Sequence, residues 1–457
     1  MNTNKNQILE AIVGLEWGDE GKGKIVDERV IFAQSQNNKK RTIVVRYQGG
    51  ANAGHSVYVP SYEGLIKFVT HMAPSGLTNN SDIAIGPQVA LNPIQLIREI
   101  TEARKLFNYA GDIFISERTG ILFSYHKKID ETRETNTKST IGTTKQGIGP
   151  FYEDNARRKT RISFAEYISE KFYAKLEDVL EMKKKELEEV GINCRELAKE
   201  IIEEHSDVRK KLFQYSSRLE YRLYDYMNNG DNIIIEGAQG SGLDVDMGTI
   251  PDQTSSHLLA PYAFPSLGLS RKNFKIYGVE KVYPTRVGLG DFPTIANDKF
   301  GEKTVENAGE IGATTGRKRR VGYPDWVFVR RSARLNDCDG IYLTRVDNVQ
   351  NVYLKVCIAY KMPTGEEIEE VPIFLQNVLP KYSDSTYSWS LWKGPENLSE
   401  PENVDLQLKD FREKYIREGF LSLPEGLKNF VRDHDKYVGV PTVGVSIGPS
   451  RGETVLI

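Results

Sequence analysis

The sequence predicts an α/β protein built around a mainly parallel β-sheet with crossover connections. Short β-rich runs recur along the chain, separated by segments long enough for helical crossovers. The first run ends in a glycine-rich loop that leads into a helix, the order found at phosphate sites. The 457 residues, 39% hydrophobic and 27% charged, are typical of an ordinary globular protein, and the length suggests one large α/β domain or two fused ones.

The first β-rich run is Ile8–Leu15, and a helix is expected over Lys24–Phe32. The further expected strands are Thr42–Tyr47, Asp82–Ile85, Asp112–Ile115, Asn232–Ile235, Phe274–Val279, Gly340–Leu343 and Val352–Tyr360. A charged stretch from Phe164 to Asn228 has apolar residues at helical spacing and predicts a solvated helical subdomain at about 161–229. Ser383–Asn403 is rich in Ser, Pro, Asn and Trp and predicts an irregular surface segment.

Charge, cysteine content and hydropathy exclude several classes of protein. A formal net charge of -2 argues against a chain that binds nucleic acid over a broad surface. Cys194, Cys338 and Cys357 are odd in number and lack CxxC spacing, so neither a disulfide framework nor a zinc site is indicated, and a cytoplasmic location is expected. The polar start, Met1–Gln7, has no apolar signal core, and no apolar run reaches the ~18 residues of a membrane span.

The segment Gly18–Lys24, GDEGKGK, is the strongest candidate for a phosphate-binding loop. It nearly satisfies the P-loop pattern GxxxxGK[ST], in which glycines let backbone amides approach phosphate oxygens. Ile25 replaces the hydroxyl that normally helps to hold magnesium, and Asp19 is the nearest hard oxygen donor. Taken alone, the loop could also be a glycine-rich turn with solvated lysines.

Three segments before residue 240 carry polar groups in glycine-rich loops. Small residues surround His55 in Arg46–Ser56, which suits a single general acid or hydrogen-bond donor, although a lone histidine is more often structural. Ile141–Pro150 and the following Arg157 and Arg158 combine hydroxyls, glycines and cations, as phosphate contacts do. Gln239 follows the strand expected at Asn232–Ile235, at the edge where open α/β sheets bind ligands.

Two segments in the C-terminal half have the character of ligand sites. Ala313–Arg320, ATTGRKRR, places hydroxyls before cations and suits a clamp for a small dianion better than an isolated nucleic-acid patch on an acidic protein. Asp347 lies just past a strand, where a carboxylate can accept the two N–H groups of a guanine edge. Considered alone, such a residue is more often a helix cap.

Together these segments resemble the adenylosuccinate synthetase family from about Ile8 to the C-terminal end. The family stretches WGDEGKGK, NAGH, GTT.GIGP.YED with ARR, EGAQG with TSS, TRVG and GATTGR stand here as Trp17–Lys24, Asn52–His55, Gly142–Asp154 with Ala156–Arg158, Glu236–Gly240 with Thr254–Ser256, Thr285–Gly288 and Gly312–Arg317. The resemblance implies the P-loop-NTPase-like fold of that family, a single domain over residues 1–457 with a large central mostly parallel β-sheet wrapped by helices and long active-site loops. It also implies a homodimer with shared sites.

The resemblance also implies a reaction. The chain would join IMP to L-aspartate with GTP and Mg²⁺, through a 6-phosphoryl-IMP intermediate, in AMP biosynthesis. Asp19 would remove the N1 proton of IMP and, with the backbone carbonyl of Gly54, contact the metal. His55 would donate to the transferred phosphoryl group, and Gln239 would polarise the purine 6-position.

Binding residues follow from the same resemblance, position by position. The implied IMP contacts are Asp19, Asn52, Thr144, Gln239, Thr254, Val287, Arg317 and, from the other subunit, Arg157. The implied aspartate contacts are Ala313, Thr314, Thr315, Arg317 and Arg319. The implied GTP contacts are Gly18, Glu20, Gly21, Lys22, Gly23, Lys24, Gly54, His55, Ser56, Arg319, Arg345, Asp347, Ser446 and Gly448, with a guanine-binding region at about 340–457.

The chain departs from the family pattern in several places. Gln146 stands where an arginine is usual, and Arg345 replaces a lysine. The stretch from Tyr152 is one residue shorter, so Arg157 and Arg158 are both candidates for the cross-subunit phosphate ligand. The insert around Ser388–Pro401 has no family counterpart.

Two alternative functions remain. One is a relative that joins aspartate to another purine nucleotide such as dGMP, and the other is a non-catalytic GTP-binding protein. Phage relatives that aminate dGMP usually lack the loop aspartate, so Asp19 favours IMP. Retention of Asp19, His55, Gln239 and Arg317 together favours an enzyme.

Overall fold

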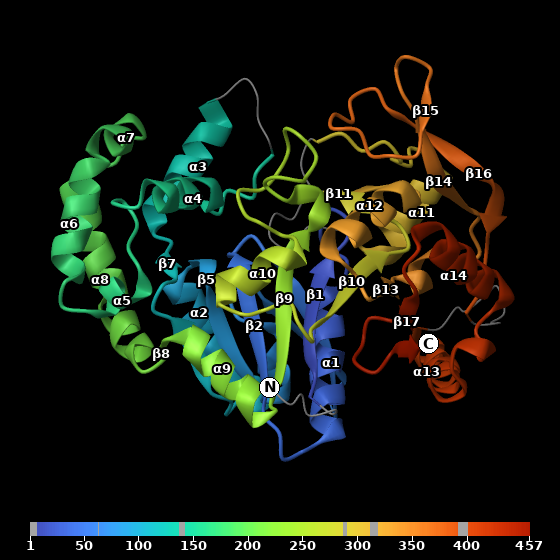
Figure 1. Ribbon diagram of the computed structural model, residues 1–457, viewed down its shortest axis with the longest axis horizontal. Coiled ribbons are helices and arrows are strands. Elements are labelled where there is room, and N and C mark those ends of the chain that lie inside the picture. Colours follow the sequence, from blue (N-terminus) through green and yellow to red (C-terminus); the bar gives the residue numbers. More distant parts are fainter. Residues whose placement is uncertain (1–6, 63, 137–141, 287–289, 311–318, 392–400) are drawn as a thin grey trace.

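A large central β-sheet organises the chain in the computed structural model, which describes residues 7–62, 64–136, 142–286, 290–310, 319–391 and 401–457 (Figure 1). The sheet has eleven strands in the order β18-β17-β13-β10-β1-β9-β2-β5-β6-β8, with β7 beside β5. Every neighbouring pair is parallel except β17 and β18. The expected mostly parallel α/β architecture is therefore confirmed.

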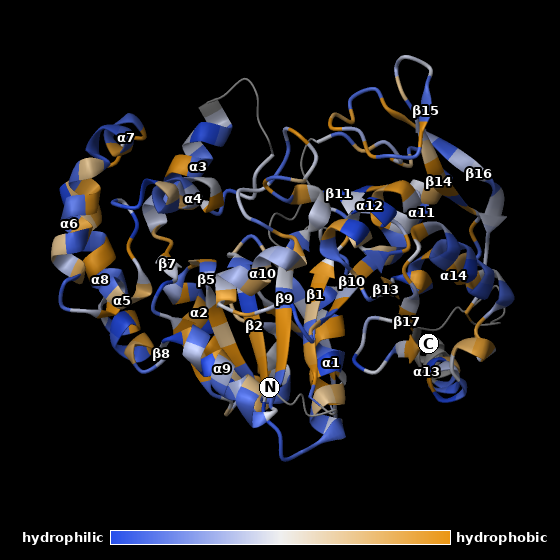
Figure 2. Ribbon diagram, viewed as in Figure 1, coloured by the Kyte–Doolittle hydropathy of each residue, from blue (hydrophilic) through white to orange (hydrophobic). Residues whose placement is uncertain are grey.

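The strands of this sheet begin and end close to the expected runs. Their bounds are β1 Leu9–Gly14, β2 Thr42–Gly49, β5 Asp82–Leu91, β6 Ile113–Ser116, β7 Gly120–Ile121, β8 Ser216–Ser217, β9 Asn232–Gly240, β10 Lys275–Lys281, β13 Gly340–Thr344, β17 Thr442–Ser446 and β18 Thr454–Leu456. All residues of β1 and β2 are buried, as expected for parallel strands that are covered on both faces (Figure 2).

One strand expected among the central ones belongs to another sheet. Residues Leu354–Lys361 form β14, which pairs antiparallel with β15 (Glu367–Ile368) and β16 (Leu379–Tyr387) in a separate three-stranded sheet. Its burial pattern, BeBBiBBe, includes exposed positions at Lys355 and Lys361, so one edge or face meets solvent. The irregular segment expected from Ser383 was wrong as far as Tyr387, because these residues complete β16.

Helices cover the sheet and connect its strands. Those before residue 230 are α1 Lys22–Gln36, α2 Pro93–Phe107, α3 Ser124–Asn136, α4 Ile148–Arg157, α5 Phe164–Ile168, α6 Phe172–Met182, α7 Lys184–Glu189, α8 Cys194–Phe213 and α9 Leu219–Asn229. Those after it are α10 Ala260–Leu267, α11 Lys299–Ala308, α12 Trp326–Asn336, α13 Pro401–Glu418 and α14 Glu425–Val438. Short antiparallel pairs join β3 (His55–Ser61) to β4 (Gly64–Thr70) and β11 (Thr285–Arg286) to β12 (Arg320–Val321).

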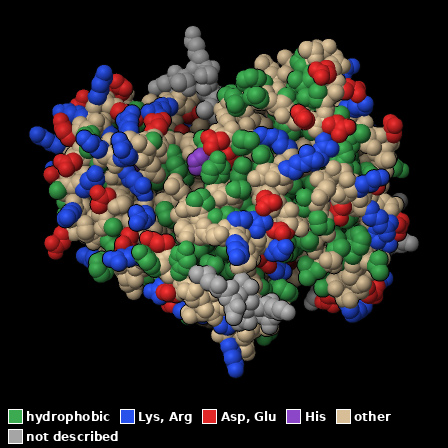
Figure 3. All heavy atoms as spheres, viewed as in Figure 1, with side chains coloured by type: hydrophobic (Ala, Val, Ile, Leu, Met, Phe, Trp, Pro, Cys, Tyr) green, Lys and Arg blue, Asp and Glu red, His purple; other side chains and the backbone are tan. Residues whose placement is uncertain are grey.

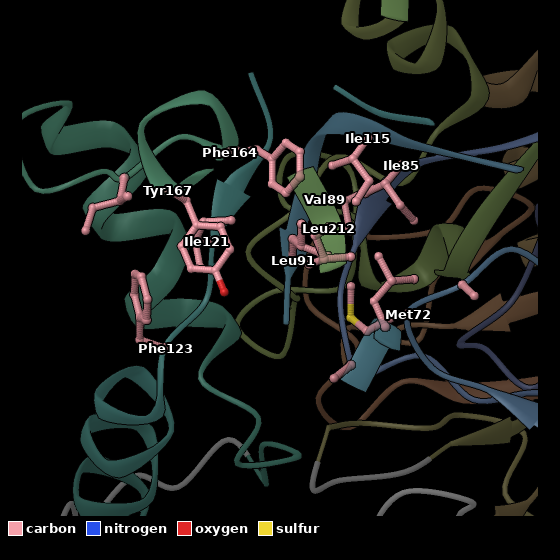
Figure 4. Packing of buried hydrophobic residues seen from close by; sticks show 14 of the residues in the cluster. Met72, Ile85, Val89, Leu91, Ile115, Ile121, Phe123, Phe164, Tyr167 and Leu212 are labelled. Atoms are coloured by element: carbon pink, nitrogen blue, oxygen red, sulfur yellow. The ribbon is translucent and has the colours of Figure 1, made fainter. Parts of the chain in front are cut away.

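Helices α5 to α8 form a layer at one end of the sheet, as seen in Figure 1. Phe164 and Tyr167 on α5 belong to the same buried cluster as Ile85 and Ile115 from the sheet strands (Figure 4). The outer faces of these helices carry both signs of charge, as in the pair Lys184–Glu181 (Figure 3). Apolar contact with the sheet therefore holds this layer in place, while its charged face meets solvent.

Two further sequence observations can be compared with the structure. All three cysteines are free thiols, Cys357 buried and Cys194 and Cys338 partly so. Among the described residues, no helix is long and apolar enough to span a membrane.

Candidate active site

The parallel topology gathers the candidate loops at one edge of the sheet. Strand β1 leads into the Gly18–Lys24 loop, β2 into the loop before His55, and β13 into Arg345. Gln239 lies within the last residues of β9, which pairs with both β1 and β2. Because neighbouring parallel strands end at the same edge, these loops meet although they are far apart in sequence.

Close contacts confirm that three loops meet around the Gly18–Lys24 segment. A Cβ atom placed on Gly18 would lie 3.7 Å from Gln239 Cα, and one on Gly23 would lie 2.9 Å from His55 Cβ. Gly18 also has a φ of 101°, in the region that favours glycine. Glycine at these two positions therefore allows the phosphate-type loop to approach both the Gln239 and the His55 segments.

Glu20 holds the loop in shape from within. Its carboxylate is fully buried and accepts the backbone N–H of Gly18 at 2.8 Å and that of Glu16 at 3.2 Å. The other carboxylate oxygen receives the Lys22 ammonium at 2.6 Å. The Glu20 side chain is therefore engaged within the loop.

Lys24 connects the loop to a distant C-terminal segment. Its ammonium donates to Ser446 Oγ at 2.6 Å and to the carbonyl oxygen of Gly448 at 2.7 Å. A third bond, to the Glu453 carbonyl oxygen, is 3.1 Å long. Ser446 and Gly448, which the resemblance placed beside GTP, therefore lie next to the phosphate-type loop.

His55 is buried and oriented by a carboxylate that the sequence reading did not identify. Its Nδ1 atom makes a short hydrogen bond to Glu236 Oε1, and Ser75 binds the same carboxylate through its backbone N–H at 2.8 Å and its hydroxyl at 2.6 Å. These bonds fix the imidazole ring and leave its Nε2 atom for another partner.

The charge state of His55 is set by opposing effects. Burial lowers the pKa of His55, the Glu236 carboxylate opposes that shift, and the cations Arg46 and Lys22 lower the pKa further. The pKa of Glu236 is lowered: burial would raise it, but His55, Arg46 and Ser75 together outweigh that effect. Addition of a phosphoryl group near His55 would raise its pKa, since an opposite charge favours the imidazolium.

Asp19 lies in the loop with a left-handed backbone, φ 62°, and its side chain is 32% exposed. Its Oδ2 atom is 2.8 Å from Nε of Arg319, whose Nη1 donates to Glu310 Oε2 at 2.6 Å. Burial would raise the pKa of Glu310, but Lys281, Arg345 and Arg319 outweigh it and hold that pKa at about 2. Glu310 therefore stays ionised and anchors Arg319 against Asp19.

The oxygen donors around Asp19 fit the preferences of Mg²⁺. A magnesium ion prefers hard oxygen ligands, keeps several waters and is completed by substrate phosphates. Asp19 offers a partly exposed carboxylate beside a loop built for phosphate, and the predicted second donor is a backbone carbonyl, that of Gly54. A carboxylate and a carbonyl are the donor types that this ion takes.

The backbone of Gln239 adopts a left-handed conformation that is unusual for a residue other than glycine. Its φ is 52°, and Gln239 follows the fully buried Glu236 by three residues. Neither Nε2 nor Oε1 contacts solvent, and neither has a hydrogen-bond partner among the described residues. Buried amides are nearly always paired in native proteins, so this carboxamide is available for a ligand.

The predicted guanine-reading residues lie directly after β13. Arg345 has a left-handed backbone, φ 64°, and precedes a short 3-10 helix, Val346–Val349. Burial raises the pKa of the Asp347 carboxyl, and Arg345 opposes that shift. Thr344 Oγ1 donates to the carbonyl oxygen of Glu20 at 2.7 Å, which connects this strand end to the phosphate-type loop.

The remaining predicted IMP contacts among the described residues lie near the two ends of α4. The helix α4 begins beside the site, because a Cβ on Gly50 would lie 2.8 Å from Ile148 Cδ1 and one on Gly149 would lie 3.6 Å from Ser255 Oγ. These contacts bring the segments that carry the candidates Asn52, Thr144 and Thr254 together.

Arg157 lies at the other end of α4. The ten residues of this helix span about 15 Å. Its guanidinium is 56% exposed and 3.7 Å from Glu186 on α7. Arg158 follows with φ 63° and is also exposed. The structure therefore places both arginines on the surface, at the helix end opposite to Gly50.

Five predicted site residues lie outside the described part of the chain. They are Val287, Ala313, Thr314, Thr315 and Arg317. Conversely, Glu236, Glu310 and Arg46 were not among the predicted site residues, although all three are buried next to residues that were. Glu236 lies in the EGAQG motif, but its hydrogen bond to His55 joins two residues that are 181 positions apart in the sequence.

Comparisons with known proteins agree over nearly the whole chain. A family model described as adenylosuccinate synthetase matches residues 11–455. The adenylosuccinate synthetase of Geotalea uraniireducens is 36% identical over 98% of this chain and 97% of its own length, and that of Trichlorobacter lovleyi is 37% identical with the same coverage.

Two solved structures are similar in fold. The fully ligated adenylosuccinate synthetase of Plasmodium falciparum has a TM-score of 0.82 and 28% identity, covering 98% of this chain and 99% of its own. A succinoaminodeoxyadenylate synthetase of cyanophage S-2L, bound to dGMP and dATP, has a TM-score of 0.60 and 14% identity, covering 98% of this chain and 95% of its own. The second likeness concerns the fold alone.

Proposed function

Because the chain belongs to the adenylosuccinate synthetase family, ligases that form a carbon–nitrogen bond, we propose that it joins IMP to L-aspartate at the expense of GTP. The products would be adenylosuccinate, GDP and phosphate. The observation that carries this proposal is the meeting of three segments: Gly18, beside Asp19, lies next to the Gln239 backbone, and Gly23 lies next to His55. A general base, a phosphoryl contact and a purine contact are then available within one site.

The first step would activate the purine. Asp19 accepts the N1 proton of IMP, and the 6-oxygen attacks the γ-phosphorus of GTP, so that the bond to the GDP oxygen breaks. The Gln239 carboxamide donates to the 6-oxygen as negative charge develops there. The His55 imidazole, oriented by Glu236, donates to the phosphoryl group in transfer.

The second step would form the carbon–nitrogen bond. The amine of aspartate attacks C6 of the 6-phosphoryl intermediate, phosphate leaves with the former 6-oxygen, and the amine loses a proton. Arg319, Arg317, Thr315 and their neighbours in the 313–319 segment would bind the aspartate carboxylates. Arg319 has the support for such a role, since the ionised Glu310 holds its guanidinium beside Asp19.

Mg²⁺ would be held by Asp19 and the Gly54 carbonyl and would supply charge neutralisation for the GTP phosphates. The guanine base would be read by Asp347 and covered by Arg345 at the C-terminal ends of β13 and β17. The chain would act as a homodimer in which Arg157 of each subunit reaches the IMP phosphate of the other. Its exposed position at the far end of α4 supports such a contact.

A comparison of four nucleotides tests this proposal. Purified protein is mixed with GTP, Mg²⁺, aspartate and, in turn, IMP, dIMP, GMP or dGMP, and the succinyl-purine and GDP products are quantified. We expect the highest kcat/KM with IMP. Turnover only with a guanine nucleotide would reject the IMP assignment, and absence of turnover with all four would indicate a silent GTP-binding relative.

A further inference from the structure

Arg46 lies fully buried beneath the site, on β2, and no step of the proposed mechanism uses it. One of its nitrogens, Nη1, donates to the carbonyl oxygen of His71 at 2.9 Å. Its Nε and Nη2 atoms have no partner among the described residues and no contact with solvent. An arginine with buried, unpaired N–H groups is uncommon in native proteins and calls for an explanation.

An unpaired nitrogen of Arg46 and the unpaired amide oxygen of Gln239 both lie close to Gly49. Gly49 has a φ of 78°. A Cβ atom on Gly49 would lie 3.5 Å from Arg46 Nη2 and 3.3 Å from Gln239 Oε1, and 2.8 Å from Ala238 Cβ. The position that a side chain on Gly49 would occupy is therefore close to both a cationic donor, Arg46 Nη2, and an amide oxygen, Gln239 Oε1.

A carboxamide can present either of its ends to a ligand. The NH₂ end donates and therefore matches a purine 6-oxo group, whereas the oxygen end accepts and matches a 6-amino group. A cation beside one end removes this ambiguity, because the oxygen is attracted to the guanidinium and the NH₂ is repelled by it. The fixed charge of arginine suits this role, since its guanidinium remains protonated in proteins.

We propose that Arg46 is a positioning residue that holds Gln239 with Oε1 toward the guanidinium and Nε2 toward the purine, and thereby makes the site select a 6-oxopurine over a 6-aminopurine. The inference rests on the proposed function through the role of Gln239. It applies equally to IMP and to dGMP, because both carry a 6-oxo group. It would also keep the 6-amino nucleotide from occupying the site.

The charges around Arg46 are compatible with this role. On the neighbouring strand β9, Glu236 is its direct register partner. Glu236 is committed to His55 and Ser75, and Glu99 is committed to the backbone N–H groups of residues 71–73. Both carboxylates balance the guanidinium charge at a distance, and neither takes up its two unpaired nitrogens.

The test measures the ratio of dissociation constants for AMP and IMP by titration calorimetry of the full chain. Wild type is compared with Arg46→Met, Arg46→Lys, Gln239→Met and the double variant Arg46→Met/Gln239→Met. We expect Arg46→Met to reduce the preference for IMP by about tenfold, the size of one hydrogen bond. We expect no further reduction when it is added to Gln239→Met, because Arg46 acts through that amide.

A matched control is Arg41→Met, at the residue just before β2, which removes an ion pair with Asp82 far from Gln239 and should leave the AMP/IMP ratio unchanged. If Arg46→Met shows no thermal unfolding transition and is therefore not folded, Arg46→Lys is used in its place, since it retains the buried charge and loses the planar guanidinium. The preference of Arg46→Lys for IMP over AMP should lie below that of wild type. Equal weakening of IMP and AMP, or a loss that persists in the Gln239→Met background, would overturn the inference.

The proposed function is judged separately, from turnover by the wild-type chain. If wild type prefers dGMP, the same ratio is measured with dGMP and its 6-amino counterpart, so the substrate assignment can fail while the role of Arg46 stands. Absence of binding to every 6-oxopurine nucleotide would overturn both.

Discussion

Oδ2 of Asp19 lies 2.8 Å from Nε of Arg319, and Arg319 is in turn bound to the buried Glu310. This chain of alternating charges joins the phosphate-type loop to the segment that precedes β12. The predicted base is therefore aligned by a cation that the resemblance assigns to aspartate and GTP. Binding of either substrate at Arg319 would alter the surroundings of Asp19.

The first prediction concerns Asp19→Asn. We expect kcat to fall by at least ~10³-fold, since an amide cannot accept the N1 proton. GTP affinity measured without Mg²⁺ should change by less than about threefold, because the loop amides and Glu20 are unaffected. Steady-state kinetics and binding of a fluorescent GTP analogue check this, with Asp207→Asn, an exposed aspartate on α8, as the control. Normal turnover by Asp19→Asn would reject Asp19 as the base.

The second prediction concerns Glu236→Gln. The neutral amide still fits the space but no longer stabilises an imidazolium at His55 or fixes its tautomer. We expect kcat to fall roughly 10–100-fold, and the activity to decline at a lower pH than in wild type, because the pKa of His55 loses the carboxylate that opposes burial. The pH profile of kcat distinguishes a lowered pKa of His55 from a smaller fraction of folded enzyme, which would lower kcat equally at every pH. An unshifted profile would contradict the role of Glu236.

The third prediction concerns Arg157. If its guanidinium serves the partner's site, Asp19→Asn and Arg157→Leu proteins are each inactive alone but form one intact site in a mixed dimer. Equimolar mixing should restore about a quarter of wild-type activity per subunit after random exchange. A parallel mixture contains Arg158→Leu in place of Arg157→Leu. The arginine whose variant is inactive alone and regains activity in the mixture is the phosphate ligand. Subunit exchange is confirmed by mass spectrometry of differently tagged chains, and absence of recovery in both mixtures would argue against a shared site.

The fourth prediction concerns stability. His434 on α14 is completely buried, with Nε2 2.9 Å from Glu280 on β10 and Nδ1 3.1 Å from Asp435. Burial alone would lower the pKa of His434, but Glu280 and Asp435 outweigh it and raise that pKa to about 9.

Because the folded pKa of His434 exceeds the unfolded value of about 6.5, its contribution is complete below pH ~6.5 and is lost as the pH rises toward 9. The size of the contribution is roughly 3 kcal/mol in the free energy of unfolding. Urea unfolding at several pH values should show this loss in wild type and not in His434→Gln. His257→Gln, an exposed histidine, is the control and should retain the wild-type pH dependence.

The sequence predicted those features that local patterns specify. The buried runs at Thr42–Tyr47 and Asn232–Ile235 became central strands because each contains a short β-branched apolar core, Ile43–Val45 or Ile233–Ile235, that fits a parallel sheet. The run at Val352–Tyr360 has the same β propensity, and composition does not reveal which sheet a strand joins. The glycine loop was recognisable from its spacing, and its contact with His55 follows from the order of strands.

The supporting residues were harder to predict, because their roles depend on contacts between distant segments. Arg46 and Glu236 stand 190 positions apart and become direct partners only through the pairing of β2 and β9. Glu310 follows α11 and binds Arg319, which lies nine residues later in the sequence. The sequence pattern marked Arg319 as part of a cationic loop and gave no sign of its carboxylate partner. The roles of Arg157 and of residues 313–317 remain predictions.

The bonds of Lys24 to Ser446 and Gly448 have a consequence for biosynthesis. Ser446 and Gly448 lie 422 and 424 residues after Lys24 along the chain. A ribosome therefore makes the phosphate-type loop first and supplies its anchor 422 residues later. A nascent chain that lacks the anchor should bind GTP poorly, so GTP in the cell would stabilise finished copies and leave incomplete ones exposed to proteolysis.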